Sequence, residues 1–298
     1  MHRETLTVVV AAGCLWLATT LGAEAQQSIR LRYQPGAGSV VHTLWRYEAT
    51  STVRDGGDAL TIEAAGLRSL THRVLEVTDG VRLVEVTRDS VRLRRRPRGG
   101  MWTQVPDVGL APDIAVVAVD DRLRVQRLEL RSAQSASASP AGTLRAFAAG
   151  LELAFPEEPQ TPGATWTADL VVPLNEPIGL EQELGVATWV EQAVDIVARS
   201  TLTLDSIVVR GTDTLVYLEA RGSLLPTTLA SAPEAGVERA RLSGALGGRL
   251  IWSTGWQTFV SGALRVQMRM ATFAGLPQDE VAGRTLETDI TTRFQVRR

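Results

Sequence analysis

Few side chains in this sequence are suited to catalysis. Beyond its first 25 residues the chain has two histidines, His42 and His72, and no cysteine or lysine. Each lies among alternating apolar and polar residues, where a lone histidine is more often a surface or hydrogen-bonded residue than a catalytic base. No nucleophile elbow, H-E-x-x-H helix or phosphate-binding glycine loop is present. We therefore predict a non-enzymatic protein with no catalytic residue, metal ligand or cofactor.

Among catalytic mechanisms, this sequence best supplies the residues for carboxylate chemistry, because two Asp or Glu side chains suffice for glycosidic hydrolysis. Glu76 and Glu85 flank an expected turn and would lie on neighbouring strands. The other interpretation is pairing with nearby arginines, such as Arg73 and Arg82, on the solvent side of a sheet. We favour the pairing and keep a carboxylate-dependent hydrolase as the weaker alternative.

The most concentrated charge in the sequence is a run of arginines: Arg92, Arg94, Arg95, Arg96 and Arg98. Guanidinium groups bind phosphate and carboxylate oxygens in pairs, so the run is a candidate anion-binding patch. Charge also protects a strand end from pairing with another chain. The absence of aromatic residues within the run favours protection, and anion binding stays the alternative.

The N-terminus has the three parts of a signal peptide. Arg3 is followed by an almost wholly apolar stretch at 6–21, and Ala23 and Ala25 form a small-residue cleavage site before Gln26. We therefore predict a signal peptide at 1–25 and a mature protein that is periplasmic, envelope-associated or secreted.

Cys14 opens a second reading of this segment, because Ala-Ala-Gly-Cys at 11–14 resembles the lipidation site of a lipoprotein. The apolar residues at 15–17 continue the hydrophobic stretch where a polar tether is usual, so a lipid anchor is less favoured. No later segment is apolar for long enough to span a membrane. The formal net charge of −2 gives no reason to expect nucleic-acid binding.

A period of two dominates the rest of the chain. Residues 264–270 alternate strictly between apolar and polar side chains, as strands half buried in an antiparallel sheet do. Turn sequences stand between such segments at 78–80, 120–121, 210–213 and 253–255. We predict a mainly β fold of curved antiparallel sheets. Strands are expected at 40–53, 60–78, 81–88, 113–119, 122–130, 201–208, 246–253, 256–272 and 286–296, with surface loops at 223–240 and 273–284.

One segment departs from this alternation. Ser139 suits a helix N-cap, Pro140 suits a first helical position, and apolar residues follow at helical spacing up to Phe155. We predict a single amphipathic helix here, within a linker at 132–163. The linker joins two related β-rich halves. They span 26–131 and 164–298, and the pattern leaves open whether they share one sheet.

Short motifs stand at the linker and near the C-terminus: Phe-Pro-Glu-Glu at 155–158, Pro-Gly-Ala-Thr-Trp at 162–166, Gly-Gly-Arg-Leu-Ile-Trp at 247–252 and Leu-Arg-Val at 264–266. They resemble a family of exported bacterial proteins of unknown function, found as secreted proteins and lipoproteins. Its members often have an aspartate before the final turn glycine, where this chain has Trp252-Ser253-Thr254. The resemblance implies curved sheets distantly like those of lipoprotein carriers, and no catalytic residue.

Curved sheets with a helix across them often leave an apolar concavity, which is the usual place for a small ligand. We therefore predict an exported binding protein for an apolar or amphiphilic ligand, such as a lipid or a lipidated chain. The alternative is a structural or protein-interaction module of the cell envelope. The sequence gives no indication of oligomeric state.

Overall fold

The computed structural model describes residues 27–55, 57–104, 114–131, 153–172, 196–231, 238–274 and 281–297. The expected signal peptide and most of the expected helix, at 139–152, lie outside these residues. Within the described residues there is no helix, and all regular structure is β-strand. The prediction of a mainly β fold is confirmed.

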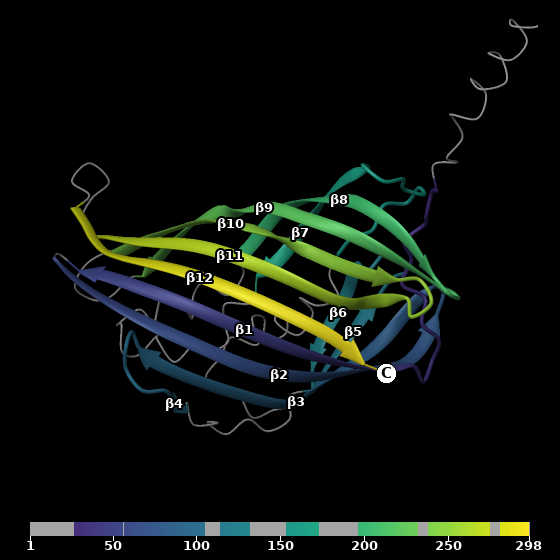
Figure 1. Cartoon of the computed structure of the whole chain (residues 1–298), viewed down its shortest axis with the longest axis horizontal. Helices are drawn as coiled ribbons and strands as arrows, with labels where there is room; N and C mark the ends of the chain where they lie inside the picture. Colours follow the sequence, from purple (N-terminus) through teal and green to yellow (C-terminus); the bar gives the residue numbers. More distant parts are fainter. Residues whose placement is uncertain are drawn as a thin grey trace, which may run out of the picture.

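The described residues form twelve strands. They are β1 (Val40–Asp55), β2 (Asp58–Thr78), β3 (Val81–Pro97), β4 (Thr103–Gln104), β5 (Ile114–Val119), β6 (Val125–Leu130), β7 (Thr165–Val172), β8 (Ile196–Arg210), β9 (Asp213–Ser231), β10 (Glu238–Ser253), β11 (Thr258–Ala274) and β12 (Val281–Arg297). All pair antiparallel in one sheet, in the order β6-β5-β3-β2-β1-β12-β11-β10-β9-β8-β7, with β4 beside β3. The sheet is strongly curved, so β5, β6 and β7 lie behind the central strands (Figure 1).

The two expected halves therefore share one sheet. β1 and β12 form the seam between them, and their pairing runs from His42 opposite Arg297 to Arg54 opposite Thr285. On one side of the seam every strand comes from 40–130, and on the other side every strand comes from 165–297.

The predicted turns at 78–80, 120–121, 210–213 and 253–255 are confirmed, since each connects two paired strands. Between β2 and β3, Asp79 and Gly80 have φ angles of 50° and 78°. When both central residues of a two-residue hairpin turn have the left-handed backbone conformation, the turn twists in the same sense as the strands. Asp-Gly is one of the preferred sequences at these two positions.

The prediction of a long loop at 223–240 is wrong, because β9 continues to Ser231 and β10 begins at Glu238. Pro226 is accommodated within β9 because the register against β10 shifts there: Leu224 pairs with Gly244, whereas Thr227 pairs with Leu242. A bulge leaves a residue outside the ladder, so the missing N–H of proline is tolerated. The loop expected at 273–284 is shortened in the same way, by β11 ending at Ala274 and β12 starting at Val281.

The sheet has an inner face of mostly buried apolar side chains and an outer face of mostly polar ones. On β8, for example, Leu202 and Leu204 are fully buried, whereas Thr201 and Asp205 are exposed. The buried side chains of both halves belong to one hydrophobic core. This arrangement follows directly from the period of two in the sequence.

A β-bulge at Asp89 determines which face the arginine run occupies. Asp89 has no partner on β2, and its carboxylate accepts hydrogen bonds from the hydroxyls of Thr71 (2.8 Å) and Ser69 (3.2 Å). An extra residue in one strand reverses the alternation of faces beyond it. Beyond the bulge the odd-numbered Leu93 is buried, and the outer face receives Arg92, Arg94 and Arg96.

Candidate functional site

The inner face is closed at one end by two irregular segments, which we call the cap: an N-terminal segment (27–35) and a strap (153–164). The two segments pair with each other through Ile29 and Gln160. The strap also exchanges backbone hydrogen bonds with β8, from Gly163 N to Leu204 O (2.7 Å) and from Leu204 N to Ala164 O (2.9 Å). The cap therefore joins the two sides of the sheet at the end where β1 begins.

An aromatic cluster packs beneath the cap. The ring of Phe155, from the strap, meets that of Trp252 edge to face, with centroids 4.8 Å apart and an interplanar angle of 82°. Phe259 completes the cluster, 5.0 Å from Trp252 and 6.0 Å from Phe155. Phe155 is 0% exposed and Trp252 is 1% exposed, so the strap is anchored in the core and not laid on the surface.

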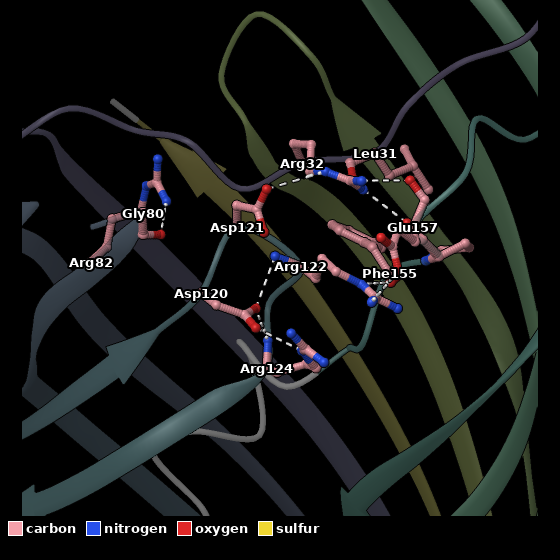
Figure 2. Close-up of polar contacts among 11 residues, drawn as sticks. Leu31, Arg32, Gly80, Arg82, Asp120, Asp121, Arg122, Arg124, Phe155 and Glu157 are labelled. Atoms are coloured by element: carbon pink, nitrogen blue, oxygen red, sulfur yellow. Dashed lines mark hydrogen bonds and ion pairs between the residues drawn. The ribbon is translucent and has the colours of Figure 1, made fainter. Parts of the chain in front are cut away.

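Asp120 organises the turn between β5 and β6 on which the cap rests (Figure 2). Its carboxylate accepts hydrogen bonds from the backbone N–H groups of Arg122 and Arg124, both at 2.9 Å, and from Nε of Arg124 at 2.6 Å. Burial of Asp120 opposes ionisation, but these donors outweigh it, and the pKa of the carboxyl lies below its usual value. Asp120 is therefore a charged anchor at neutral pH.

Two arginines connect this turn to the cap (Figure 2). Nε of Arg122 donates to the carbonyl of Phe155 (2.7 Å), and the N–H of Phe155 donates to the carbonyl of Arg122 (2.8 Å). Arg32 donates to the carbonyl of Pro156 (2.8 Å) and pairs with Asp121 (3.2 Å). The cap is thus held by polar contacts outside and by aromatic packing inside.

We expect Asp120→Asn to lower the free energy of unfolding by about 2 kcal/mol, because hydrogen bonds to a charged group contribute about 1.5–3 kcal/mol. Urea unfolding at pH 7 measures this change. Asp169→Asn is the matched control, since Asp169 is 53% exposed and its contact with Arg199 is a weak 3.4 Å pair. Equal losses in the two variants would contradict the anchoring role of Asp120.

Beside the cap, the inner face contains a pocket. Its wall is formed by the start of β1, the ends of β2 and β12, and the hairpin between β10 and β11. Apolar and aromatic side chains make most of this wall: Val41, Trp45, Val74, Phe259, Phe294 and Val296. The wall is mainly apolar with a few polar groups, as in sites for small organic ligands, but the enclosed space of about 30 Å³ is close to that of one water molecule.

Two polar atoms of the pocket residues are buried without a hydrogen-bond partner among the described residues, Nδ1 of His72 and Nε1 of Trp45. An unpaired buried polar atom costs about 1–3 kcal/mol, so native proteins rarely leave one without a water or ligand to bind. Burial, reinforced by the nearby Arg68 and only partly opposed by Asp89, lowers the pKa of His72 to about 4. His72 is therefore neutral at pH 7.

The other residues that the sequence suggested for catalysis, His42, Glu76 and Glu85, lie away from this pocket. His42 lies on the outer face, exposed, with Nδ1 2.9 Å from the hydroxyl of Thr71. Glu76 and Glu85 lie on neighbouring strands, as predicted, and Glu85 is paired in register with Arg73. Neither glutamate lines the pocket.

The structure divides the arginine run between two environments. Arg92, Arg94 and Arg98 are exposed, whereas Arg96 forms an ion pair with Glu63 at 2.6 Å. Arg95 falls on the other side of the strand from its two neighbours. The aromatic partner that the run itself lacks is Trp102, which follows the Gly99-Gly100 turn.

Among the described residues, no three His, Cys, Asp or Glu side chains gather as metal ligands would. The part of the chain that the structure describes also holds no helix able to cross a membrane.

No protein-family profile matches the sequence, and no functionally curated protein is similar to it. Among solved structures, lipovitellin, in a structure describing its lipid–protein interactions, matches 89% of this chain with 9% identity and a TM-score of 0.46. The match covers 26% of the lipovitellin chain, so this chain spans about a quarter of that protein. The chain is not assigned to a family by this likeness.

Two further likenesses are weaker. An outer membrane channel (COG4313) from Pseudomonas putida F1 is 8% identical, with a TM-score of 0.23 over 90% of this chain and 98% of that one. A DUF1329 family protein from Desulfovibrio piger is 11% identical, with a TM-score of 0.13 over 85% and 84% of the two chains. The resemblance to an exported family of unknown function therefore stays a prediction.

Proposed function

We propose that this protein is exported and binds, without catalysis, an apolar or amphiphilic ligand such as a lipid on the inner face of its sheet. The observation that carries the proposal is the pocket beside the cap. Its wall matches a hydrocarbon chain in chemistry, although the side chains must move apart to admit one, and Nδ1 of His72 and Nε1 of Trp45 are buried there without partners among the described residues. Nε1 of Trp45 is a donor, so it suits an oxygen of the ligand's polar group.

One pair of carboxylates on the outer face is arranged in a way that does not suit glycosidic hydrolysis. Glycosidic hydrolysis needs one carboxyl group with a raised pKa to act as an acid. An open outer groove holds Asp289 and Glu287, and each contacts an arginine, Arg265 or Arg269. Hydrogen bonding from Arg265 lowers the pKa of Asp289, which is the opposite of what the acid role requires.

Native mass spectrometry of the mature protein, purified without detergent from its exporting host, tests the proposal. We expect a mass above that of the chain from Gln26 to Arg298, with an excess that is released on denaturation and identified as lipid. The same spectrum locates the cleavage site. A ligand-free mass that stays unchanged after incubation with a lipid extract would contradict binding and favour an envelope-interaction module.

A pair of tryptophan substitutions on β1 tests the location of the ligand. Val41 lines the pocket, whereas Leu44 lies on the outer face, and both are half buried. We expect Val41→Trp to weaken binding of a fluorescent fatty acid by about tenfold, since excluding two methylene groups costs about 1.6 kcal/mol. Leu44→Trp should leave the affinity unchanged. Equal affinities in both variants would place the ligand elsewhere.

A further inference from the structure

The outer face carries an exposed group of basic and apolar side chains at the end of β3, which we call the basic-aromatic patch. It consists of Arg92, Arg94, Arg98, Met101 and Trp102. Met101 is 88% exposed, and Trp102 is 36% exposed. β3 starts beside the cap and runs away from it, so the patch lies at the opposite end of the sheet (Figure 1).

Trp102 is held on this surface by arginines. The guanidinium carbons of Arg94 and Arg96 each lie 4.6 Å from the centroid of its ring. Such cation–π contacts are weak at exposed sites, so they orient the indole without burying it. Indole rings in this setting suit the boundary between water and lipid, because one part is apolar and the N–H is polar.

The charge of the patch is largely uncompensated within the described residues. Glu63 is paired with Arg96, and no ion pair joins Arg92, Arg94 or Arg98 to a carboxylate in the described ranges. Protection of a strand edge does not account for Arg94, because β4 already pairs with β3 at this position. Edge protection therefore leaves Arg94 and the two exposed apolar side chains, Met101 and Trp102, unexplained.

We propose that the basic-aromatic patch is a docking surface for an anionic phospholipid membrane. The arginines contact the phosphate groups, and Met101 and Trp102 enter the interface between headgroups and acyl chains. Charge complementarity selects an anionic surface, and the exposed Met101 selects a lipid surface over an acidic polysaccharide, which offers nothing apolar to bury. The docking surface lies on the outer face, so it is independent of the ligand proposed for the inner pocket.

Co-sedimentation of the mature protein with lipid vesicles tests docking. We expect binding to vesicles of phosphatidylcholine with 30% phosphatidylglycerol, loss of that binding at high salt, and little binding to pure phosphatidylcholine. Each arginine near such a surface contributes about fivefold to the partition coefficient, so replacing three of them should reduce binding by about a hundredfold. The test variant is Arg92→Gln/Arg94→Gln/Arg98→Gln.

The matched control removes the same charge from other exposed positions on β6, β8 and β9, in Arg127→Gln/Arg199→Gln/Arg221→Gln. It should bind within about threefold of the unsubstituted protein, since a distant charge is screened beyond a Debye length of about 10 Å. Circular dichroism confirms that both variants are folded. Equal losses in both triple variants would show a response to net charge alone and overturn the proposal.

Depth of insertion gives a second readout. Vesicles made with brominated acyl chains should quench part of the tryptophan fluorescence, and Trp102→Phe should lose that part. Absence of quenching, or binding of an acidic polysaccharide in place of the vesicles, would also overturn membrane docking. A fluorescent fatty acid that binds in vesicle-free solution would still show that the inner pocket is functional, so failure of the two proposals can be told apart.

Discussion

Replacing Phe155 with alanine is expected to lower the free energy of unfolding by about 3–5 kcal/mol, the usual cost of removing a large buried aromatic side chain. Phe155 is fully buried and contacts both Trp252 and Phe259. Removing its ring leaves a cavity under the strap and withdraws the edge-to-face contact with Trp252. Most domains are stable by only about 5–15 kcal/mol, so this single change removes a large share of the total.

Urea unfolding followed by circular dichroism measures the loss at Phe155. Val209→Ala is the control, because Val209 is 59% exposed and its replacement should change stability by no more than about 0.5 kcal/mol. A loss below about 1 kcal/mol for Phe155→Ala would show that the strap does not contribute to the core. In that case, the cap would be an attachment to the sheet and not part of its folding unit.

The second large effect is expected from pH. His72 has a pKa of about 4 when folded and about 6.5 when unfolded, so between these values the unfolded chain binds more protons. His72 therefore does not lower the free energy of unfolding above pH 6.5. As the pH falls from 6.5 towards 4, proton uptake by the unfolded chain lowers the free energy of unfolding. Below pH 4 the loss due to His72 grows no further. The difference between the two pKa values corresponds to a loss of about 3 kcal/mol in the free energy of unfolding.

Chemical unfolding at pH 7, 5.5 and 4 tests this expectation. In the His72→Leu variant, the free energy of unfolding should fall much less between pH 7 and pH 4 than in the unsubstituted protein. His42→Gln should keep most of this fall in stability, since His42 is exposed on the outer face and is the smallest of the influences on the pKa of His72. Carboxylates with lowered pKa values, such as Asp120 and Asp213, lose their contributions mainly below about pH 4. The effect of His72 and that of the carboxylates are thus separated by the pH range in which each occurs. A pH dependence of stability in His72→Leu that equals that of the unsubstituted protein would contradict the role of His72.

Local features of the fold could be predicted from the sequence because their causes are local. Asp79-Gly80 specifies a hairpin through its own backbone conformation, and strict alternation at 264–270 specifies a half-buried strand. The seam between β1 and β12 could not be predicted, because alternation does not say which distant strands pair. The continuation of β9 past Pro226 was missed because the bulge that accommodates the proline depends on β10.

The candidate site was predictable only in its general character. Alternation implied an apolar face, but the meeting of Trp45, His72 and Phe259 at one pocket depends on the seam and on the cap. The arginine run was visible, yet its face depends on the bulge at Asp89, whose hydroxyl partners are on another strand. Trp102 was missed as the aromatic partner of the arginines because it follows the turn at 99–100.

The seam also has a consequence for the order of events during synthesis. β1 is the first strand of the sheet to be made and β12 is the last, and they are direct neighbours. Hairpins such as β2–β3 can form early, but the sheet stays in two parts until the final strand is released from the ribosome. Pairing between such distant segments is slow, because the loop between them must be closed first. For the exported chain proposed above, this delay favours crossing the membrane before the two halves are joined.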